Sequence, residues 1–338
     1  MKKIIFLVIF LVSTNCFAID LKGTGATFPY KFLKSAFDSY EKKNIDTKIN
    51  YIPSGSKKGY ESLKSQSVDF SAVDMYLKDE LLKTFPYPNE IIHIPICVSG
   101  IGIAYNVKNV GTLNLSAKII SEILIRNITN WNDPEIKKLN PDKQLPNLEI
   151  IVILREGGSG SSYLLTQYLS KLNNLWKLTF GELLEIKFPG CILAKNSEQM
   201  QKLLSQVPGS FGYLAYSYKD GENFNFAAIE NINGNYIKPS TKSISEAANI
   251  PLPTDTRISI IDSNSEKGYP LSSFSWIITY KNQNYNTKNL NKHTELKSLL
   301  TWIVQNGQSH TEKTGYSPLP QKAKLAAKNV IEQLYFSN

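Results

Sequence analysis

The sequence contains the glycine- and serine-rich stretch Arg155-Glu156-Gly157-Gly158-Ser159-Gly160-Ser161-Ser162. An apolar run over 148–154 precedes it and predicts a buried strand, and apolar residues at helical spacing follow it over 163–172. The stretch therefore joins a strand to the first turn of a helix, where glycines let the backbone approach a ligand and backbone N–H groups lack partners. Together with Arg155 and the hydroxyls of Ser159 and Ser161, these donors predict a binding site for an anion.

The first 18 residues have the pattern of a secretory signal peptide. Two lysines are followed by an apolar run over 4–12 and by a short stretch ending in Ala18, after which we expect cleavage. A lipid anchor on Cys16 is the less favoured alternative, because residues 13–15 are a poor approach to an acylated cysteine. We therefore expect the mature chain to work in the periplasm.

The remaining chain has the composition of a globular protein that is long for a single core. With 338 residues, of which 42% are hydrophobic and 20% charged, two lobes are the expected organisation. The 38 basic and 29 acidic residues give a net charge of +9, and removal of Lys2 and Lys3 leaves 36 basic residues and a charge of about +7. This excess is compatible with attraction of an anion, whereas the scattered lysines argue against nucleic-acid binding.

The cysteines and histidines do not indicate a metal site or a catalytic nucleophile. Cys97 and Cys191 both lie in apolar sequence surroundings, so two buried free thiols are expected, with a disulfide between them as the open alternative. His93, His293 and His310 lie far apart and lack partners at ligand spacing. No metal site, cofactor or histidine-based triad is therefore expected.

Two further glycine-containing loops repeat the arrangement of the first. The segment over 21–29 is expected to be a short strand that runs into a turn, in which Thr27 is the N-cap of a helix. A second strand, over 48–52, runs into a loop in which Ser56 is the expected cap. Neither loop completes a nucleotide-binding motif. A third strand, over 68–74, ends on Asp74, which is a cap or a site carboxylate. If the three loops meet at one cleft, their donors suit a tetrahedral oxyanion.

The rest of the chain alternates strands and helices, which predicts α/β layers. An apolar stretch over 91–107, broken by one proline and two glycines, is expected to leave the first lobe and enter the second. A strand over 274–280 is expected to return to the first lobe. Residues 221–266 are polar and predict only loops and short strands. The expected helices in these regions cover 116–125, 197–207, 296–305 and 320–335.

A set of short motifs extends in order over nearly the whole expected mature chain. They are Gly25-Ala26-Thr27-Phe28-Pro29, Gly55-Ser56, Val68 through Asp74, Trp131-Asn132-Asp133 with Leu139-Asn140-Pro141, Arg155 through Ser162, Pro208-Gly209-Ser210-Phe211-Gly212-Tyr213 and Tyr269-Pro270. As a set they resemble the phosphate-binding protein of bacterial phosphate-specific ABC importers, a type II periplasmic binding protein. The resemblance implies a two-lobed α/β fold, in which each lobe is a mixed sheet flanked by helices and the ligand lies in the cleft between them.

The resemblance also implies how the chain divides and what it does. Residues 19–97 and 270–338 would form the first lobe, and residues 98–269 the second. A monomer without cofactor or catalytic activity would capture inorganic phosphate and deliver it to the transmembrane permease of an ABC importer. By position, the ligand-binding residues would be Thr27, Phe28, Ser56 and Asp74 from the first lobe, and Arg155, Ser159, Gly160 and Ser161 from the second.

Two positions bear on the choice of ligand. Phosphate keeps a proton at neutral pH and sulfate does not, so Asp74 can accept a hydrogen bond from phosphate but repels sulfate. We expect the affinity for phosphate to exceed that for sulfate by a factor of roughly 10⁴ or more. Gly157 stands where many proteins of the resembled family have an aspartate that pairs with the arginine. Without that aspartate, less of the charge of Arg155 is neutralised. We therefore expect phosphate binding to be at least retained, and to depend more on salt than in proteins that have the aspartate.

Two alternatives remain open on the sequence. The same fold could bind another oxyanion, such as sulfate, molybdate or a phosphonate, although Asp74 argues against fully ionised ligands. A secreted hydrolase could use Ser159 as its nucleophile, because the glycines around it approach a nucleophile elbow. The last glycine of that motif and a histidine base are missing, which disfavours the hydrolase.

Overall fold

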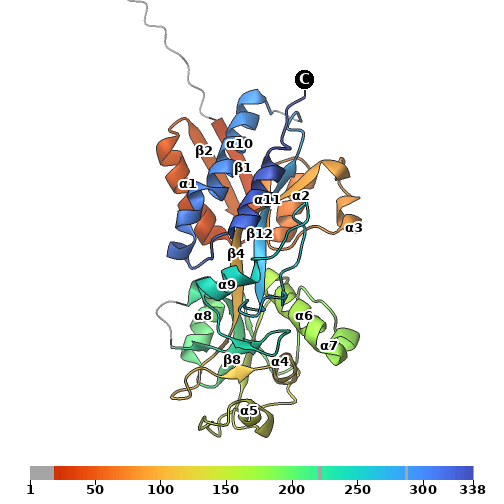
Figure 1. Ribbon diagram of the computed structural model, residues 1–338. Coiled ribbons are helices and arrows are strands. Elements are labelled where there is room, and N and C mark those ends of the chain that lie inside the picture. The colour runs from red at the N-terminus through yellow and green to blue at the C-terminus, as the bar shows by residue number, and fades with distance from the viewer. Residues whose placement is uncertain (1–18, 220–222, 286–287, 338) are drawn as a thin grey trace, which may run out of the picture.

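The computed structural model describes residues 19–219, 223–285 and 288–337 (Figure 1). Two lobes are stacked one above the other and are joined by two strands in the middle of the view, β4 (Ile91–Tyr105) and β12 (Ser272–Tyr280). The expected signal peptide lies outside the described residues. Within them, no helix combines the length and the apolar character that crossing a membrane requires.

The other elements alternate between strands and helices. Before β4 the chain forms β1 (Ile19–Gly25), α1 (Tyr30–Lys43), β2 (Thr47–Pro53), α2 (Ser56–Lys64), β3 (Phe70–Val73), α3 (Asp79–Leu82) and η1 (Pro88–Glu90). Between β4 and β12 it forms β5 (Asn114–Leu115), α4 (Ala117–Leu124), α5 (Pro134–Leu139), β6 (Ile151–Arg155), α6 (Gly160–Leu172), α7 (Asn174–Thr179), β7 (Ile192–Ala194), α8 (Ser197–Gln206), β8 (Ser210–Ala215), η2 (Tyr216–Tyr218), β9 (Asn225–Phe226), β10 (Ala228–Glu230), β11 (Tyr236–Ile237) and α9 (Thr241–Ala247). After β12 it forms α10 (Leu290–Val304), η3 (Asn306–His310), η4 (Glu312–Thr314) and α11 (Gln321–Ile331).

One mixed sheet of the described residues runs through both lobes, with strand order β2-β1-β3-β12-β4-β8-β6-β7 and β9 paired to β4. Strand β4 pairs with β12 along its first ten residues, and from Ile101 onward it pairs with β8. Every residue of β4 is buried, as expected for a strand covered on both faces. The long apolar stretch predicted to cross between the lobes is therefore this strand.

The sheet directs several strand ends toward the space between the lobes. Strands β1, β2 and β3 run parallel to one another, and β6 runs parallel to β7 and β8. Ligands of such sheets bind beyond the carboxyl ends of the strands. Those ends are followed here by the glycine-containing loops that the sequence analysis singled out, and the α/β two-lobed fold is confirmed.

The expected helices form, with differences at their ends. Helix α4 begins after Ser116, whose hydroxyl accepts the N–H of Ile119. Helix α10 begins at Leu290, six residues before the expected start, because the Asn289 side chain caps it. Helix α11 ends at Ile331, before the expected end. At the starts of α4 and α10, a single capping side chain sets the boundary.

The motif around Trp131 has a packing role in the second lobe. Trp131 is fully buried, and its indole N–H donates to the Gly209 carbonyl at 3.0 Å. Asn140 is also buried, and its amide exchanges hydrogen bonds with the backbone N–H and C=O of Asn114 at 2.8 and 2.9 Å. Both residues satisfy buried backbone groups of distant loops, so the motif holds the second lobe together.

The segment before β12 contacts the first lobe earlier than the predicted boundary at residue 270. The Thr256 hydroxyl donates to the His93 carbonyl at 2.5 Å, and Arg257 Nη1 donates to the Leu77 carbonyl at 3.2 Å. The division of the chain between the lobes therefore stays a prediction at this point. The two cysteines are free thiols, with Cys97 in the core and Cys191 only half-buried.

Close backbone packing fixes α2 against the strands that end at the cleft. A Cβ atom on Gly59 of α2 would lie 2.4 Å from Ser71 Oγ and 2.6 Å from Gly25 Cα. Gly25 itself has φ of +126°, and its carbonyl accepts the N–H groups of Ser54 and Gly55. Glycine at both positions therefore lets the loop after β1 and the start of α2 lie side by side.

This packing predicts that Gly59→Ala destabilises the protein although alanine is the better helix former. Overpacking against a backbone atom costs about 1–3 kcal/mol, more than the helix propensity gained. We expect the free energy of unfolding, measured by urea denaturation, to fall in Gly59→Ala and to stay within about 0.5 kcal/mol in the control Glu61→Ala, an exposed position of the same helix. A more stable Gly59→Ala protein would contradict the packing described.

Candidate functional site

A cavity of about 320 Å³ lies between the two lobes. All eight residues predicted as ligand-binding line it: Thr27, Phe28, Ser56, Asp74, Arg155, Ser159, Gly160 and Ser161. They come from the turn after β1, the start of α2, the end of β3 and the connection from β6 to α6. The structure thus brings together segments that lie up to about 130 residues apart in the sequence, and their part in binding stays a prediction.

Three helices that follow predicted ligand-binding loops begin at this cavity. Helix α1 begins at Tyr30, separated from the lining residues Thr27 and Phe28 by Pro29, while α2 begins at Ser56 and α6 at Gly160. The first backbone N–H groups of a helix have no acceptor within it, and the helix dipole places partial positive charge at the same end. Three such ends around one cavity favour an anion.

Neither hydroxyl expected to cap a helix makes that bond. Pro29 and not Thr27 stands at the N-cap of α1, and no side chain caps this helix. Gly55, with φ of +93°, takes the N-cap of α2 and places Ser56 inside the helix. The Ser56 hydroxyl instead accepts the Asp74 N–H at 3.2 Å and donates to Asp74 Oδ2 at 3.4 Å. Both capping expectations are wrong, although both hydroxyls remain at the cavity.

Asp74 is a buried carboxylate at the end of β3. Its side chain belongs to a residue only 5% exposed, and it accepts hydrogen bonds from Ser275 at 3.2 Å and from Ser56. Burial raises the pKa of Asp74 to about 7, against the opposing effect of these two hydrogen bonds. The carboxyl therefore changes charge near neutral pH, and Ser275 from β12 is a contributor that the sequence analysis missed.

The first turn of α6 approaches Asp74 from the other side of the cleft. A Cβ atom placed on Gly160 would lie 3.1 Å from Asp74 Oδ2 and 3.4 Å from its Cβ. A larger side chain would lie in tight contact with the carboxylate, and glycine avoids this contact. The partial positive end of α6 therefore faces the buried carboxylate across the cavity.

Arg155 ends β6 with its guanidinium at the cavity. Its Nη1 donates to the Ser197 hydroxyl at 3.1 Å, and its backbone N–H donates to the Tyr213 hydroxyl at 3.2 Å. Its Nε–H is buried and has no hydrogen-bond partner among the described residues. Burial lowers the pKa of Arg155, yet a guanidinium stays charged in proteins. A buried unpaired donor of this kind is satisfied by an anion.

Gly157 adopts a left-handed conformation, with φ of +71°, and a Cβ atom there would meet no atom within 4 Å. Its N–H donates to Glu185 Oε1 at 3.1 Å, and Glu185 pairs with Lys187 at 3.0 Å. The ion pairs of the described residues do not include Arg155. The elbow therefore leaves this arginine without a carboxylate partner, as its sequence indicated.

Further residues line the cavity that the sequence analysis did not assign to it. They are Ser54, Gly55, Lys57, Lys58, Met75, Gly158, Tyr163, Leu184 and Ser197. The two lysines follow Ser56 directly, so the Ser-Lys-Lys run at a helix start was an available signal. Ser197 opens α8 behind the cap Asn196, which is the same strand–loop–helix pattern as at the other loops. Leu184 belongs to a loop without such a pattern, and no local signal places it here.

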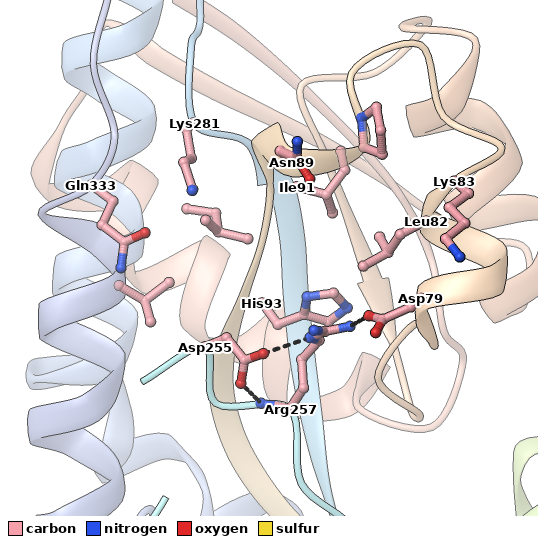
Figure 2. A pocket seen from close by; sticks show the side chains of 13 residues that line it. Asp79, Leu82, Lys83, Asn89, Ile91, His93, Asp255, Arg257, Lys281 and Gln333 are labelled. Atoms are coloured by element: carbon pink, nitrogen blue, oxygen red, sulfur yellow. Dashed lines mark hydrogen bonds and ion pairs between the residues drawn. The ribbon is translucent and has the colours of Figure 1, made fainter. Parts of the chain in front are cut away.

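A second cavity, of about 460 Å³, lies in the first lobe beside the start of β4 (Figure 2). Arg257 is its central cation, and it pairs with Asp79 at 2.5 Å and with Asp255 at 2.8 Å. His93 accepts the Leu77 N–H through Nε2, and burial lowers its pKa to about 3, so it stays neutral. Arg257 is therefore already paired with two carboxylates, whereas Arg155 at the interlobe cavity has no carboxylate partner among the ion pairs of the described residues.

The interlobe cavity contains donors, cations and one buried carboxylate, but its lining includes no histidine. Ser159 therefore has no imidazole beside it that could act as a base. Among the described residues, no group of three or more His, Cys, Asp or Glu side chains could hold a metal ion. The arrangement suits noncovalent binding of a small oxyanion.

Curated relatives cover most of the chain. The phosphate-binding protein PstS of Haemophilus influenzae is 31% identical over 310 residues, with 90% of each chain covered. PstS of Pasteurella multocida is 30% identical over 317 residues, which cover 90% of this chain and 88% of that protein.

Solved structures share the fold at lower identity. A phosphate-binding protein from Stenotrophomonas maltophilia superposes with a TM-score of 0.71 at 18% identity, over 92% of this chain and 93% of that one. A phosphate transport receptor from Vibrio cholerae gives a TM-score of 0.60 at 17% identity, over 89% and 100% of the two chains. The family model described as a PBP superfamily domain matches residues 14–306. This protein therefore belongs to the PBP superfamily and, within it, to the family of the PstS phosphate-binding proteins.

Proposed function

We propose that this protein captures inorganic phosphate between its lobes, outside the cytoplasm, and delivers it to the transmembrane permease of an ABC importer without catalysing a reaction. The buried carboxylate of Asp74, facing helix N-termini and Arg155 across one cavity, is the observation that carries the proposal. The donors attract any oxyanion, whereas the carboxylate accepts a hydrogen bond only from a protonated one. Phosphate is such an oxyanion at neutral pH, and sulfate is not.

The proposed contacts come from both lobes. In the first lobe, Thr27 and Ser56 supply hydroxyls, Phe28 supplies its backbone N–H, and Asp74 is the acceptor. In the second lobe, Arg155 supplies its free Nε–H, and Ser159, Gly160 and Ser161 supply the first turn of α6. An anion that touches both sets stabilises the closed arrangement relative to the open one.

The division into lobes and the export of the chain belong to the same proposal. Residues 19–97 with 270–338 would form one lobe and residues 98–269 the other, in a monomer that is released by cleavage after Ala18. Within the second range, Thr256 and Arg257 contact the first lobe. The names of the PstS relatives support a solute-binding role. The lining without histidine supports a role other than hydrolysis.

The first prediction of the proposed function concerns ligand choice at Asp74. In Asp74→Asn the charge that repels sulfate is lost, and the acceptor for the phosphate proton is weaker. We expect phosphate affinity to fall about 10- to 100-fold, as for loss of a charged hydrogen bond, and sulfate binding to become measurable. Calorimetric titration with each anion measures both effects.

The matched control is Asp46→Asn, which removes the same charge from an exposed aspartate. It should bind phosphate like the wild type and still reject sulfate. If Asp74→Asn also bound phosphate as tightly as wild type and excluded sulfate, Asp74 would have no role in selectivity.

The second prediction follows from the raised pKa of Asp74, which is about 7. Below this pH the carboxyl is protonated, carries no charge and can donate a hydrogen bond to a fully ionised oxyanion. Sulfate affinity of the wild type should therefore rise about tenfold or more between pH 8.5 and pH 5.5. The pH series is measured by calorimetry, and Asp74→Asn should show no such rise. A flat profile in the wild type would exclude the titration of this carboxyl as the cause of sulfate rejection.

The third prediction concerns the unpaired charge of Arg155. Gly157→Asp restores a carboxylate two residues after the arginine, and Gly157→Asn has the same shape and backbone cost without the charge. Raising the salt concentration from 0.05 to 0.5 M should weaken phosphate binding roughly severalfold in the wild type and in Gly157→Asn, but less in Gly157→Asp. Equal salt dependence in all three proteins would show that the charge of Arg155 is neutralised by other means.

A further inference from the structure

Two side chains from opposite lobes meet next to the interlobe cavity. Lys31 is the second residue of α1, and its Nζ lies 3.8 Å from the centroid of the Tyr218 ring. Tyr218 ends η2, which follows β8 in the second lobe. An ammonium group over an aromatic face is a cation–π contact. Because the partners belong to different lobes, this contact depends on how far the lobes are closed.

The position of Lys31 in its helix gives a separate indication that the contact matters. Cations are disfavoured in the first turn of a helix, and the first turn of α1 contains no acidic residue that would offset this one. The stability of α1 therefore does not account for a lysine here. The aromatic face of Tyr218 provides the compensating negative potential from across the cleft.

Tyr218 is in turn held by the group of residues around Arg155. Its hydroxyl donates to Glu198 Oε1 at 2.8 Å, and Glu198 is the second residue of α8. Burial, and then the hydrogen bond to Glu198, raise the pKa of Tyr218, so the hydroxyl stays protonated and keeps donating. The adjacent Ser197 accepts the hydrogen bond of Arg155 Nη1. The start of α8 thus contacts both the ring under Lys31 and the guanidinium at the cavity.

We propose that the contact between Lys31 and Tyr218 acts as a latch across the cleft: it stabilises the closed form over the bound anion and lowers the dissociation rate of phosphate. The latch rests on the proposed function, since it acts on phosphate held in this cavity. A second cross-cleft pair, Lys78 with Glu182 at 3.7 Å, accompanies it. In Figure 1, α1 and α8 lie on the left of the view and α2 and α6 on the right, and the latch belongs to the left pair.

A latch differs from simple attraction of the anion by Lys31. Steering by a surface charge changes the association rate, whereas a contact formed after closure changes the dissociation rate. Lys31→Met should therefore release phosphate about two- to fivefold faster, the range expected for an exposed cation–π contact, with the association rate nearly unchanged. Lys31→Arg keeps the cation and should restore slow release.

The experiment measures loss of radiolabelled phosphate from the full-length mature protein into excess unlabelled phosphate, with affinity from calorimetry. Tyr218→Leu should match Lys31→Met, and the double variant should release no faster than either single variant because both have lost the same contact. Tyr218→Phe keeps the ring face and should retain most of the slow release. Lys34→Met, which removes an exposed lysine of the same helix paired with Asp38, is the control and should not differ from wild type.

Unchanged release in Lys31→Met, slower association in place of faster release, or additive effects in the double variant would each overturn the latch. A failure of the proposed function is recognised separately, because the wild-type protein would then show no phosphate binding in the same titrations. If Tyr218→Leu were poorly folded, as judged by its thermal unfolding, the comparison of Lys31→Met with Lys31→Arg decides the question alone.

Discussion

The carboxylate of Asp74 lies buried at the end of β3, opposite the first turn of α6, and its charge has few ways of being compensated. Two serine hydroxyls donate to it, and no cation is paired with it among the described residues. Burial therefore holds its pKa near 7. Burying a charged carboxylate carries a free-energy penalty. A ligand offsets this penalty when one of its oxygens donates a hydrogen bond to the carboxylate and its negatively charged oxygens bind the helix ends.

The fold brings these opposing groups together through a single sheet. Strand β4 pairs with β12 in one lobe and with β8 in the other, so the lobes share a continuous set of hydrogen bonds. Asp74 follows a strand beside β12, and Arg155 ends a strand beside β8. Both therefore lie where the strands end at the cleft, one in each lobe. Contacts such as that between Lys31 and Tyr218 then bias the lobes toward closure.

Much of this site could be predicted from the sequence, because its groups lie in short local patterns. Glycines and hydroxyls between a strand and a helix indicated the loops at Ser56 and Ser159. The resemblance to a known family implied that Asp74 lies at the same site as these loops. The capping roles of Thr27 and Ser56 were wrong, since a proline and a left-handed glycine take the N-cap positions. Ser275 and Tyr218 could not be assigned, because their contacts join elements distant in sequence and depend on packing. Ser197 follows a strand and begins a helix, as the residues of the predicted loops do, but its contact with Arg155 depends on packing.

The central claim is that one buried carboxylate makes a site that would bind any oxyanion selective for a protonated oxyanion. Arginine, hydroxyls and helix ends make the cavity attractive to phosphate and sulfate alike, and only the acceptor distinguishes them. The most direct test is calorimetric titration of the wild-type protein with phosphate and sulfate side by side at pH 8.5. We predict tight binding of phosphate and no measurable binding of sulfate. Comparable affinity for the two anions would contradict the account.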